Sequence, residues 1–226
     1  MVTYRIGVLG GIDPESTREF YEKLITRLKL NGNISKNEDF PQIIINSIPA
    51  PALIYDKISA KDLKPYLAGL KELDKMNPDF IVMVCNTIYL YYEELQSQIK
   101  TPILDLREEV KKALLNRKIH RPLIIGTPNT IRQGLYRFEG IKSMEPDENE
   151  IAKISNAIFD YSMYKSKEKQ VKIVENICMK YTKLGADAVI LGCTDLAVML
   201  RGKKIPQINT IDVLVEAVIL RVAKKV

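Results

Sequence analysis

Two short apolar segments that each end in a cysteine constrain this chain more than any other feature. Residues 79–87 read Asp-Phe-Ile-Val-Met-Val-Cys-Asn-Thr, and residues 187–195 read Asp-Ala-Val-Ile-Leu-Gly-Cys-Thr-Asp. A continuous apolar run of this length, bounded by polar residues, is typical of a strand buried on both faces of a parallel sheet. Ligands of such sheets bind just beyond the carboxyl ends of the strands. We therefore expect Cys85 and Cys193 to lie where chemistry takes place.

The surroundings of the two cysteines repeat along the chain. In each half a strand ends in glycine, helical periodicity follows, and the cysteine strand and a short strand that starts at a proline come next. Gly10 and Cys85 are 75 residues apart, and Gly126 and Cys193 are 67 apart. The repeat predicts an α/β fold of two pseudo-symmetric Rossmann-like lobes. Each lobe is expected to be a parallel sheet flanked by helices, with the active site in the cleft between the lobes.

The predicted first lobe comprises residues 1–105 and 211–226, and the second comprises residues 106–210. Besides the cysteine segments, the pattern predicts strands over 4–9, 42–48, 102–105, 123–127 and 206–209. It predicts helices over 60–76, 89–99, 106–116, 129–138, 149–164, 168–184, 195–200 and 211–222, and one starting at Pro14. Asp13 is suited to cap the helix that starts at Pro14. A strand, a glycine turn and a helix start form an anion-binding arrangement, although neither a dinucleotide fingerprint nor a P-loop is present.

Charge and composition exclude several classes of partner. The net charge of +6 comes from 34 basic residues interleaved with 28 acidic ones, which is typical of a solvated lysine-rich surface and does not favour nucleic-acid binding. No run of 18 or more apolar residues is present, so we expect no membrane-spanning helix. The N-terminal apolar stretch is short and lacks a cleavage signature, and we expect a cytoplasmic location.

The cysteine and histidine counts argue against a metal site. Three cysteines without a Cys-x-x-Cys pair do not indicate a disulfide framework or a zinc ribbon. His120, the chain's one histidine, lies in a basic loop and is expected to be exposed and structural. Cys178 lies on the apolar face of a predicted helix and is expected to be an inert core thiol. Because no lysine ends either cysteine strand, a pyridoxal phosphate enzyme is not favoured.

Two opposed thiols are suited to inverting a stereocentre. One thiolate removes the α-proton while the other thiol delivers a proton to the opposite face, and the ordinary cysteine pKa of about 8.5 allows both roles. Backbone N–H groups at the helix starts would lower the pKa of the thiol that ionises. Asn86, Thr87 and Thr194 are positioned to donate to the substrate carboxylate. A single buried cysteine is more often a small core residue, but the matched positions of Cys85 and Cys193 favour catalysis.

Three motifs in this order resemble the aspartate/glutamate racemase family: Ile6-Gly7-Val8-Leu9-Gly10-Gly11, Cys85-Asn86-Thr87 and Gly192-Cys193-Thr194. The resemblance covers almost the whole chain and is greatest to aspartate racemases. It implies a cofactor-independent enzyme that interconverts L- and D-aspartate through two catalytic cysteines, is dimeric and acts on a small anionic amino acid. It also implies a larger set of substrate-binding residues, which comprises Gly11, Ile12, Ser47, Asn86, Thr87, Ile88, Thr127, Thr130 and Thr194.

Basic residues that the family uses to bind carboxylates are replaced in this chain. Tyr89 stands where histidine is common, Ala52 lies in the segment where aspartate racemases place an arginine, and Met163 aligns with a lysine. Lys57 and Lys165 are nearby in sequence without matching. Asp195 stands where glutamate is common. The proton chemistry is therefore predicted more firmly than the substrate.

Other functions stay open on these residues. A glutamate racemase, a racemase for another acidic amino acid or a maleate isomerase would use the same two thiols, whereas a decarboxylase of the malonate type needs only one. A non-catalytic protein that binds a small acid would need neither thiol to ionise easily.

Overall fold

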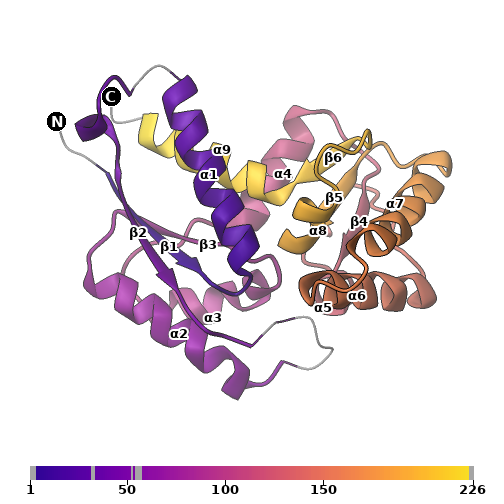
Figure 1. The fold of residues 1–226 in the computed structure, drawn as a ribbon, viewed down its shortest axis with the longest axis horizontal. Helices are drawn as coiled ribbons and strands as arrows, with labels where there is room; N and C mark the ends of the chain where they lie inside the picture. The colour runs from indigo at the N-terminus through magenta and orange to yellow at the C-terminus, as the bar shows by residue number, and fades with distance from the viewer. Residues whose placement is uncertain (1–3, 32–33, 52, 54–57, 224–226) are drawn as a thin grey trace.

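The protein contains two parallel sheets that lie beside each other, each with helices packed around it (Figure 1). The computed structural model describes residues 4–31, 34–51, 53 and 58–223. The first sheet has the strand order β2-β1-β3 and the second has the order β4-β5-β6. Their bounds are Arg5–Gly10 (β1), Gln42–Ser47 (β2), Phe80–Met83 (β3), Leu123–Gly126 (β4), Val189–Gly192 (β5) and Gln207–Asn209 (β6).

The two sheets repeat the same arrangement. Strand β1 pairs in parallel with β3, which leads to Cys85, and β4 pairs in parallel with β5, which leads to Cys193. One isolated parallel bridge extends each pair, from Ile81 to Ile103 in the first sheet and from Leu123 to Met144 in the second. The predicted fold of two similar α/β lobes is confirmed. The lobe boundaries proposed from the sequence stay a prediction.

Helices connect the strands, because parallel strands need crossover connections. Their bounds are Pro14–Leu30 (α1), Ala60–Lys75 (α2), Tyr92–Gln96 (α3), Leu106–Asn116 (α4), Pro128–Arg132 (α5), Glu148–Ser162 (α6), Lys167–Lys183 (α7), Thr194–Met199 (α8) and Thr210–Ala223 (α9), with 3-10 turns at Asn37–Asp39 (η1) and Thr87–Tyr91 (η2). The Asp13 carboxylate accepts hydrogen bonds from the N–H groups of Glu15 and Ser16, which confirms the predicted cap of α1.

Three predicted elements differ from the structure. The strand expected over 102–105 is reduced to the single bridge at Ile103. The helix expected over 129–138 ends at Arg132, because the chain turns at Gly134, whose φ of +69° suits glycine. The helix expected over 89–99 starts as the tighter turn η2 directly after the first cysteine motif.

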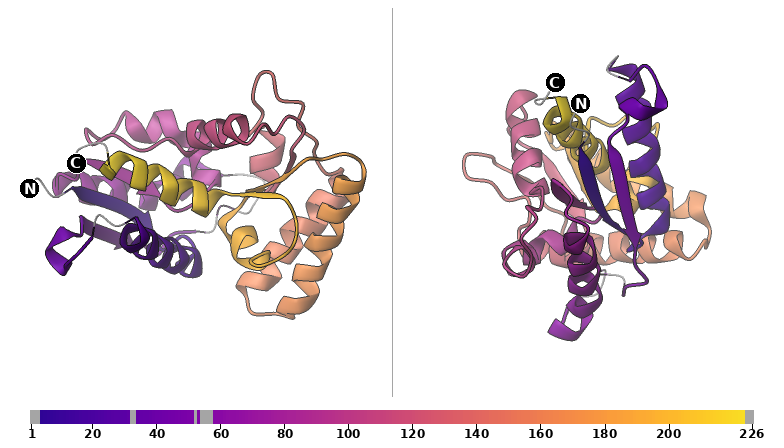
Figure 2. Two further views of the ribbon diagram at one scale, coloured as in Figure 1. Left: turned by 90° about the horizontal axis from the view of Figure 1, so that it is seen from above. Right: turned by 90° about the vertical axis from the view of Figure 1, so that its left-hand side faces the viewer.

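Burial explains the pattern of the strands. Strands β3, β4 and β5 are buried along their whole length, whereas every residue of the edge strand β2 is exposed or half-buried. Helix α9 leads away from the second sheet and packs against α1 and α4 (Figure 2). Among the described residues, no helix is long and apolar enough to cross a bilayer.

Candidate active site

Cys85 lies in the short segment between the end of β3 at Met83 and the start of the turn η2 at Thr87. Its side chain is buried, with 8% of its surface exposed. The backbone N–H groups of Thr87 and Ile88 donate hydrogen bonds to Cys85 Sγ and favour the thiolate. Burial outweighs these donors and raises the pKa of the Cys85 thiol to about 12.

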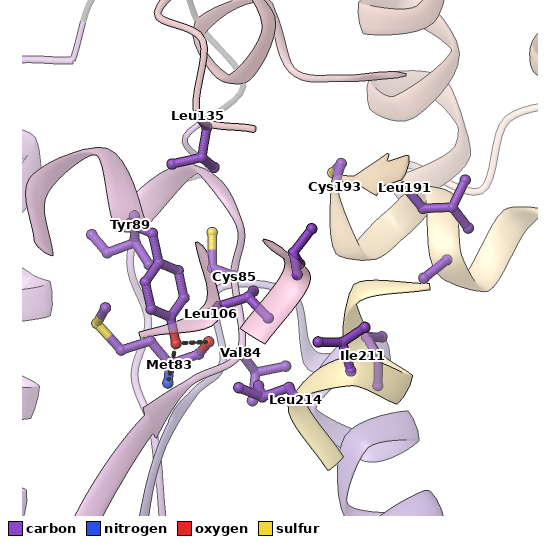
Figure 3. Close-up of a cluster of buried hydrophobic side chains, with 14 of the residues drawn as sticks. Met83, Val84, Cys85, Tyr89, Leu106, Leu135, Leu191, Cys193, Ile211 and Leu214 are labelled. Atoms are coloured by element: carbon purple, nitrogen blue, oxygen red, sulfur yellow. Dashed lines mark hydrogen bonds between the residues drawn. The ribbon is translucent and has the colours of Figure 1, made fainter. Parts of the chain in front are cut away.

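Cys193 occupies the corresponding position after β5, at the start of α8. The thiol donates a hydrogen bond to Asp195 Oδ2 over 3.3 Å, and only 6% of the residue is exposed. Burial raises the pKa of Cys193 well above its ordinary value, and the negative charges of Asp195 and of a Cys85 thiolate add to that effect. The two thiols are therefore near enough for the charge on one to oppose ionisation of the other. Figure 3 shows both in one cluster of buried side chains.

The sequence-based expectation that N–H groups would lower the thiol pKa is only half right. The donors act in the predicted direction at Cys85, but the loss of hydration is the larger effect and the net pKa is raised. The Asp195 carboxyl shares this environment. Burial and the negative charges of Asp13 and Glu15 raise the pKa of Asp195 to about 7. Asp195 can therefore exchange a proton with its surroundings near neutral pH.

Three predicted binding residues meet across the boundary between the sheets. Thr87 Oγ1, which follows β3, lies 3.0 Å from Thr127 Oγ1 and 3.2 Å from Thr130 Oγ1, both of which follow β4. Thr127 Oγ1 also donates to Thr130 Oγ1 over 3.0 Å. All three residues are at least nine-tenths buried. Since hydroxyl groups rotate, this cluster of Thr87, Thr127 and Thr130 could turn its O–H groups toward an anion.

Asn86 is held by a second buried network. Tyr136 O–H donates to Asn86 Oδ1, and Asn86 Nδ2 donates to Thr210 Oγ1 over 3.0 Å. Thr210 Oγ1 in turn donates to the carbonyl oxygen of Leu191 over 2.9 Å. The network fixes the residue after Cys85 against the second sheet and the start of α9. Tyr136 and Thr210 were missed from the sequence, because nothing in their own segments marks them as partners of Asn86.

The remaining predicted binding residues lie at neighbouring strand ends. Gly11, with a φ of +84°, donates its N–H to Thr17 Oγ1 over 3.0 Å, and a Cβ at this position would lie 2.5 Å from the backbone nitrogen of Ile48. The turn after β1 is thus pressed against the end of β2, where Ser47 lies opposite Gly10. Ile12 is half-buried, Ile88 is buried beside the Cys85 thiol and Thr194 is buried at the start of α8. That these residues bind substrate stays a prediction.

The residues that stand in place of the family's basic residues lie in different surroundings. Tyr89 is fully buried, and its hydroxyl bonds the backbone of Met83 rather than entering the space near the thiols (Figure 3). Met163 is more than half exposed at the end of α6, and Lys165 lies 3.9 Å from Asp160. Lys167, two residues further along, lies with its Nζ 3.5 Å from Glu15 Oε1 on α1. Ala52 and Lys57 lie outside the described residues.

The other residues singled out from the sequence have no visible part in this site. His120 is exposed, as expected. Cys178 is fully buried on α7, where burial raises its pKa to about 12, as fits a core thiol. Within the described part of the chain, no three histidine, cysteine, aspartate or glutamate side chains are grouped so that they could hold a metal ion.

Comparison with known proteins places this site in a family. A model of the Asp/Glu/hydantoin racemase family matches residues 9–218, a range that includes both thiols, the threonine cluster and Asp195. The chain belongs to that family. The broad-specificity amino-acid racemase RacX of Bacillus subtilis is 32% identical over 133 residues, which span 58% of each protein. The chain therefore matches little more than half of that relative's length.

Solved structures of this family share the fold. An aspartate racemase from Picrophilus torridus superposes with a TM-score of 0.78 at 21% identity, covering 97% of this chain and 94% of its own. An aspartate racemase homologue from Pyrococcus horikoshii superposes with a TM-score of 0.74 at 22% identity, covering 98% of this chain and all of its own. At these identities the likeness establishes the fold alone.

Proposed function

We propose that the protein is a cofactor-independent amino-acid racemase in which Cys85 and Cys193 exchange the α-proton of the substrate. The observation that carries the proposal is the pair of buried thiols that follow matched strands of the two sheets and belong to one cluster of buried side chains (Figure 3). Two acid/base groups on opposite sides of one carbon are what inversion requires.

The proposed proton transfers balance within one turnover. A thiolate takes the α-proton, so that an S–H bond forms while the C–H electron pair moves into an enolate-like carboxylate. The opposite thiol then gives its proton to the other face of the carbon and becomes the thiolate. In the reverse direction the thiols exchange roles. A positively charged α-ammonium group beside a buried thiol would favour its ionisation and offset the burial that raises its pKa.

Several neighbours support this chemistry. The N–H groups of Thr87 and Ile88 would stabilise a Cys85 thiolate, and the Asp195 carboxylate is placed to accept the proton of Cys193. The hydroxyls of Thr87, Thr127 and Thr130 could donate to the substrate carboxylate and stabilise the charge that develops on it.

Aspartate is the substrate that the family resemblance predicts, and the similarity to two structures of aspartate-racemase type supports testing it first. Glutamate remains an alternative, since a glutamate racemase from Aquifex pyrophilus is 32% identical over 51% of this chain. A homodimer and a cytoplasmic location are further parts of the proposal. Sedimentation equilibrium of the purified chain would test the proposed homodimer.

Exchange of the α-proton in deuterated water tests the proposal directly. Purified protein without added cofactor should exchange the α-proton of at least one member of a panel of L- and D-amino acids and should interconvert its enantiomers. Cys85→Ala and Cys193→Ala should each abolish interconversion, whereas Cys178→Ala should retain it. Interconversion that survives in either active-site variant would overturn the two-thiol mechanism.

A second candidate function is binding of a small acid without catalysis. The raised pKa of both thiols favours it, because a binding protein has no need of an easily ionised thiol. The same exchange assay separates the two functions. Tight binding of an amino acid with no exchange in either enantiomer would favour the binding protein.

A further inference from the structure

Thr210, the first residue of α9, has a hydroxyl group at a place where the repeat has an apolar residue. In each half of the chain a segment that begins with proline ends in a residue that caps the next helix, Asp105 before α4 and Asn209 before α9. The residue after the cap is Leu106 in the first half and Thr210 in the second, and each is only 1% exposed. A buried hydroxyl is costly unless it is bonded, so packing alone does not account for the threonine.

The Thr210 hydroxyl is bonded to both of the segments that carry the proposed catalytic thiols. It donates to the carbonyl oxygen of Leu191 over 2.9 Å and accepts from Asn86 Nδ2 over 3.0 Å. Leu191 lies in β5 two residues before Cys193, and Asn86 directly follows Cys85. A single oxygen atom thus connects β5 to the segment that follows β3. Because Thr210, Leu191 and Asn86 are buried, these bonds form away from water, where they are stronger.

The partners of the Thr210 hydroxyl are held in fixed positions. The Asn209 side chain accepts hydrogen bonds from two N–H groups in the first turn of α9 over 3.0 Å and 3.2 Å, and β6 is paired with β5 up to Asn209. Because the Thr210 O–H is donated to a carbonyl group, its oxygen accepts from Asn86, which places Nδ2 of the amide on this side. On the other side Tyr136 O–H donates to Asn86 Oδ1. The amide of Asn86 is therefore held in one orientation.

The placement of the two thiols relative to each other decides whether they can invert one carbon. An acid/base group has to lie within hydrogen-bond reach of the proton that it moves, and a displacement of about 1 Å can cost roughly 100-fold in rate. Cys85 follows a strand of the first sheet and Cys193 a strand of the second, and among the described residues no strand pairing joins the two segments. The bonds of Thr87 lead to the end of β4, whereas the bond of Thr210 leads to β5, the strand before Cys193.

We infer that Thr210 is a positioning residue, whose hydroxyl holds the segment after Cys85 against the strand before Cys193 so that both thiols face the same carbon. This role rests on the proposed racemase function and adds to it a residue outside both cysteine motifs. Thr210 acts through Asn86 and Leu191 and touches no reacting atom. Its loss should therefore slow proton transfer in both directions without removing a contact that binds the substrate.

Thr210→Val tests this role, because valine keeps the shape of the side chain and removes both bonds. The rate is measured with the amino acid that the native protein exchanges fastest, starting from each enantiomer. In both directions kcat should fall about 10-fold to 100-fold, whereas KM should change by less than about 3-fold. Thr210→Ser keeps the hydroxyl and should restore most of kcat. Thr182→Val, which removes a hydroxyl bonded to a carbonyl within α7, is the matched control and should leave kcat unchanged.

Tyr136→Phe tests whether Thr210 acts through Asn86, because it removes the bond on the other side of the same amide. It should also lower kcat, and Thr210→Val should add little to its effect, since both changes release one amide. Losses that multiply in the double variant would show that Thr210 does not act through Asn86 and would overturn its assigned role. The rates are compared well below the lowest Tm among the variants, because the loss of a buried bond also lowers stability.

Failure of the positioning role can be told apart from failure of the racemase function. An unchanged kcat in Thr210→Val, with a native protein that racemises, would overturn the role of Thr210 and leave the two-thiol mechanism in place. A raised KM with an unchanged kcat would show that the network serves substrate binding and would overturn that role as well. If Thr210→Val does not fold, an unchanged kcat in Tyr136→Phe has the same consequence. If the native protein exchanges no amino acid, the racemase function fails and the role of Thr210 fails with it.

Discussion

Cys85 and Cys193 end corresponding strands of the two sheets, but the segments that follow give them different surroundings. The turn η2 after Cys85 supplies backbone N–H groups from Thr87 and Ile88, which favour a thiolate. The first turn of α8 after Cys193 supplies the Asp195 carboxylate, which accepts a hydrogen bond from the thiol and opposes a thiolate. Of the two buried thiols, Cys85 is therefore the one that ionises more readily.

The difference shows that a repeated scaffold fixes where a thiol lies without fixing its protonation. Position comes from the strand, which is equivalent in both sheets. Protonation depends on the few atoms around the sulfur, and these belong to the loop and helix that follow. An inverting pair benefits from this asymmetry, since one member has to start as a base while the other starts as an acid.

The largest effect is expected from removing either thiol of the Cys85 and Cys193 pair. Cys85→Ser and Cys193→Ser should each slow racemisation by about 1000-fold or more, because general acid–base groups contribute on that scale. The double variant should be little slower than either single variant, because both thiols serve one reaction. Chiral chromatography of the product measures the racemisation rates of the single and double variants. Losses that multiply in the double variant would show that the thiols act independently.

The next effect concerns the acid beside Cys193. Asp195→Asn removes the proposed acceptor of the thiol proton and should lower the rate about 10-fold to 100-fold in the direction that uses Cys193 as base. In the unmodified protein that rate should rise as the pH passes through about 7, where Asp195 ionises. The variant should lack this rise. Asp187→Asn, which lies just before the opposite end of β5, is the control and should retain it.

Asp195 should also affect stability in a predictable direction. Its pKa is higher in the folded chain, about 7, than the ordinary 3.8, so folding favours the protonated form. That contribution is present below pH 4 and is lost as the pH rises toward 7. Asp195→Asn should reduce the decrease in Tm between about pH 4 and pH 7 by a few degrees, as differential scanning calorimetry would measure. An unchanged decrease would show that Asp195 ionises normally.

A smaller effect tests the contact between the lobes. Thr87→Val keeps the shape of the side chain but removes its bonds to Thr127 and Thr130, at a cost of about 1–2 kcal/mol in the free energy of unfolding. Activity should fall about 10-fold, and Thr87→Ser should restore most of it. Thr182→Val removes a hydroxyl that bonds within α7, and its activity should not change. Full activity in Thr87→Val would rule out a role in orienting the substrate.

The smallest expected effect concerns how easily a reagent in solution reaches each of the two thiols. Tyr164 on the second lobe donates its O–H to Glu15 on the first, and Tyr164→Phe should loosen this contact. Alkylation of Cys85 and Cys193 by iodoacetamide should then accelerate a few-fold relative to the core thiol Cys178, with Cys85 reacting first. Mass spectrometry of the labelled peptides measures all three sites, and Tyr21→Phe on α1 serves as the control. Faster labelling of Cys193 than of Cys85 would contradict the assigned difference in ionisation.

Local patterns in the sequence were enough to predict most of the elements and the repeat. The long helices α1, α2, α4, α6 and α7 follow from apolar spacing and caps, and the cysteine strands follow from continuous apolar runs. The strand expected at Ile103 was not realised beyond one bridge. Whether a short segment forms a strand depends on the strand beside which it folds. The sequence of a few residues does not show which strand that will be.

The sequence by itself determined the two thiols, their equivalent positions and the polar residues that adjoin them, because each follows directly from its own strand. Only the tertiary structure decided how those groups behave. Burial reversed the expected direction of the thiol pKa shifts, Thr87 met Thr127 and Thr130 across the lobes, and Asp13 came to act on Asp195. Hydration and charge depend on distances between residues far apart in the chain, and folding alone sets those distances.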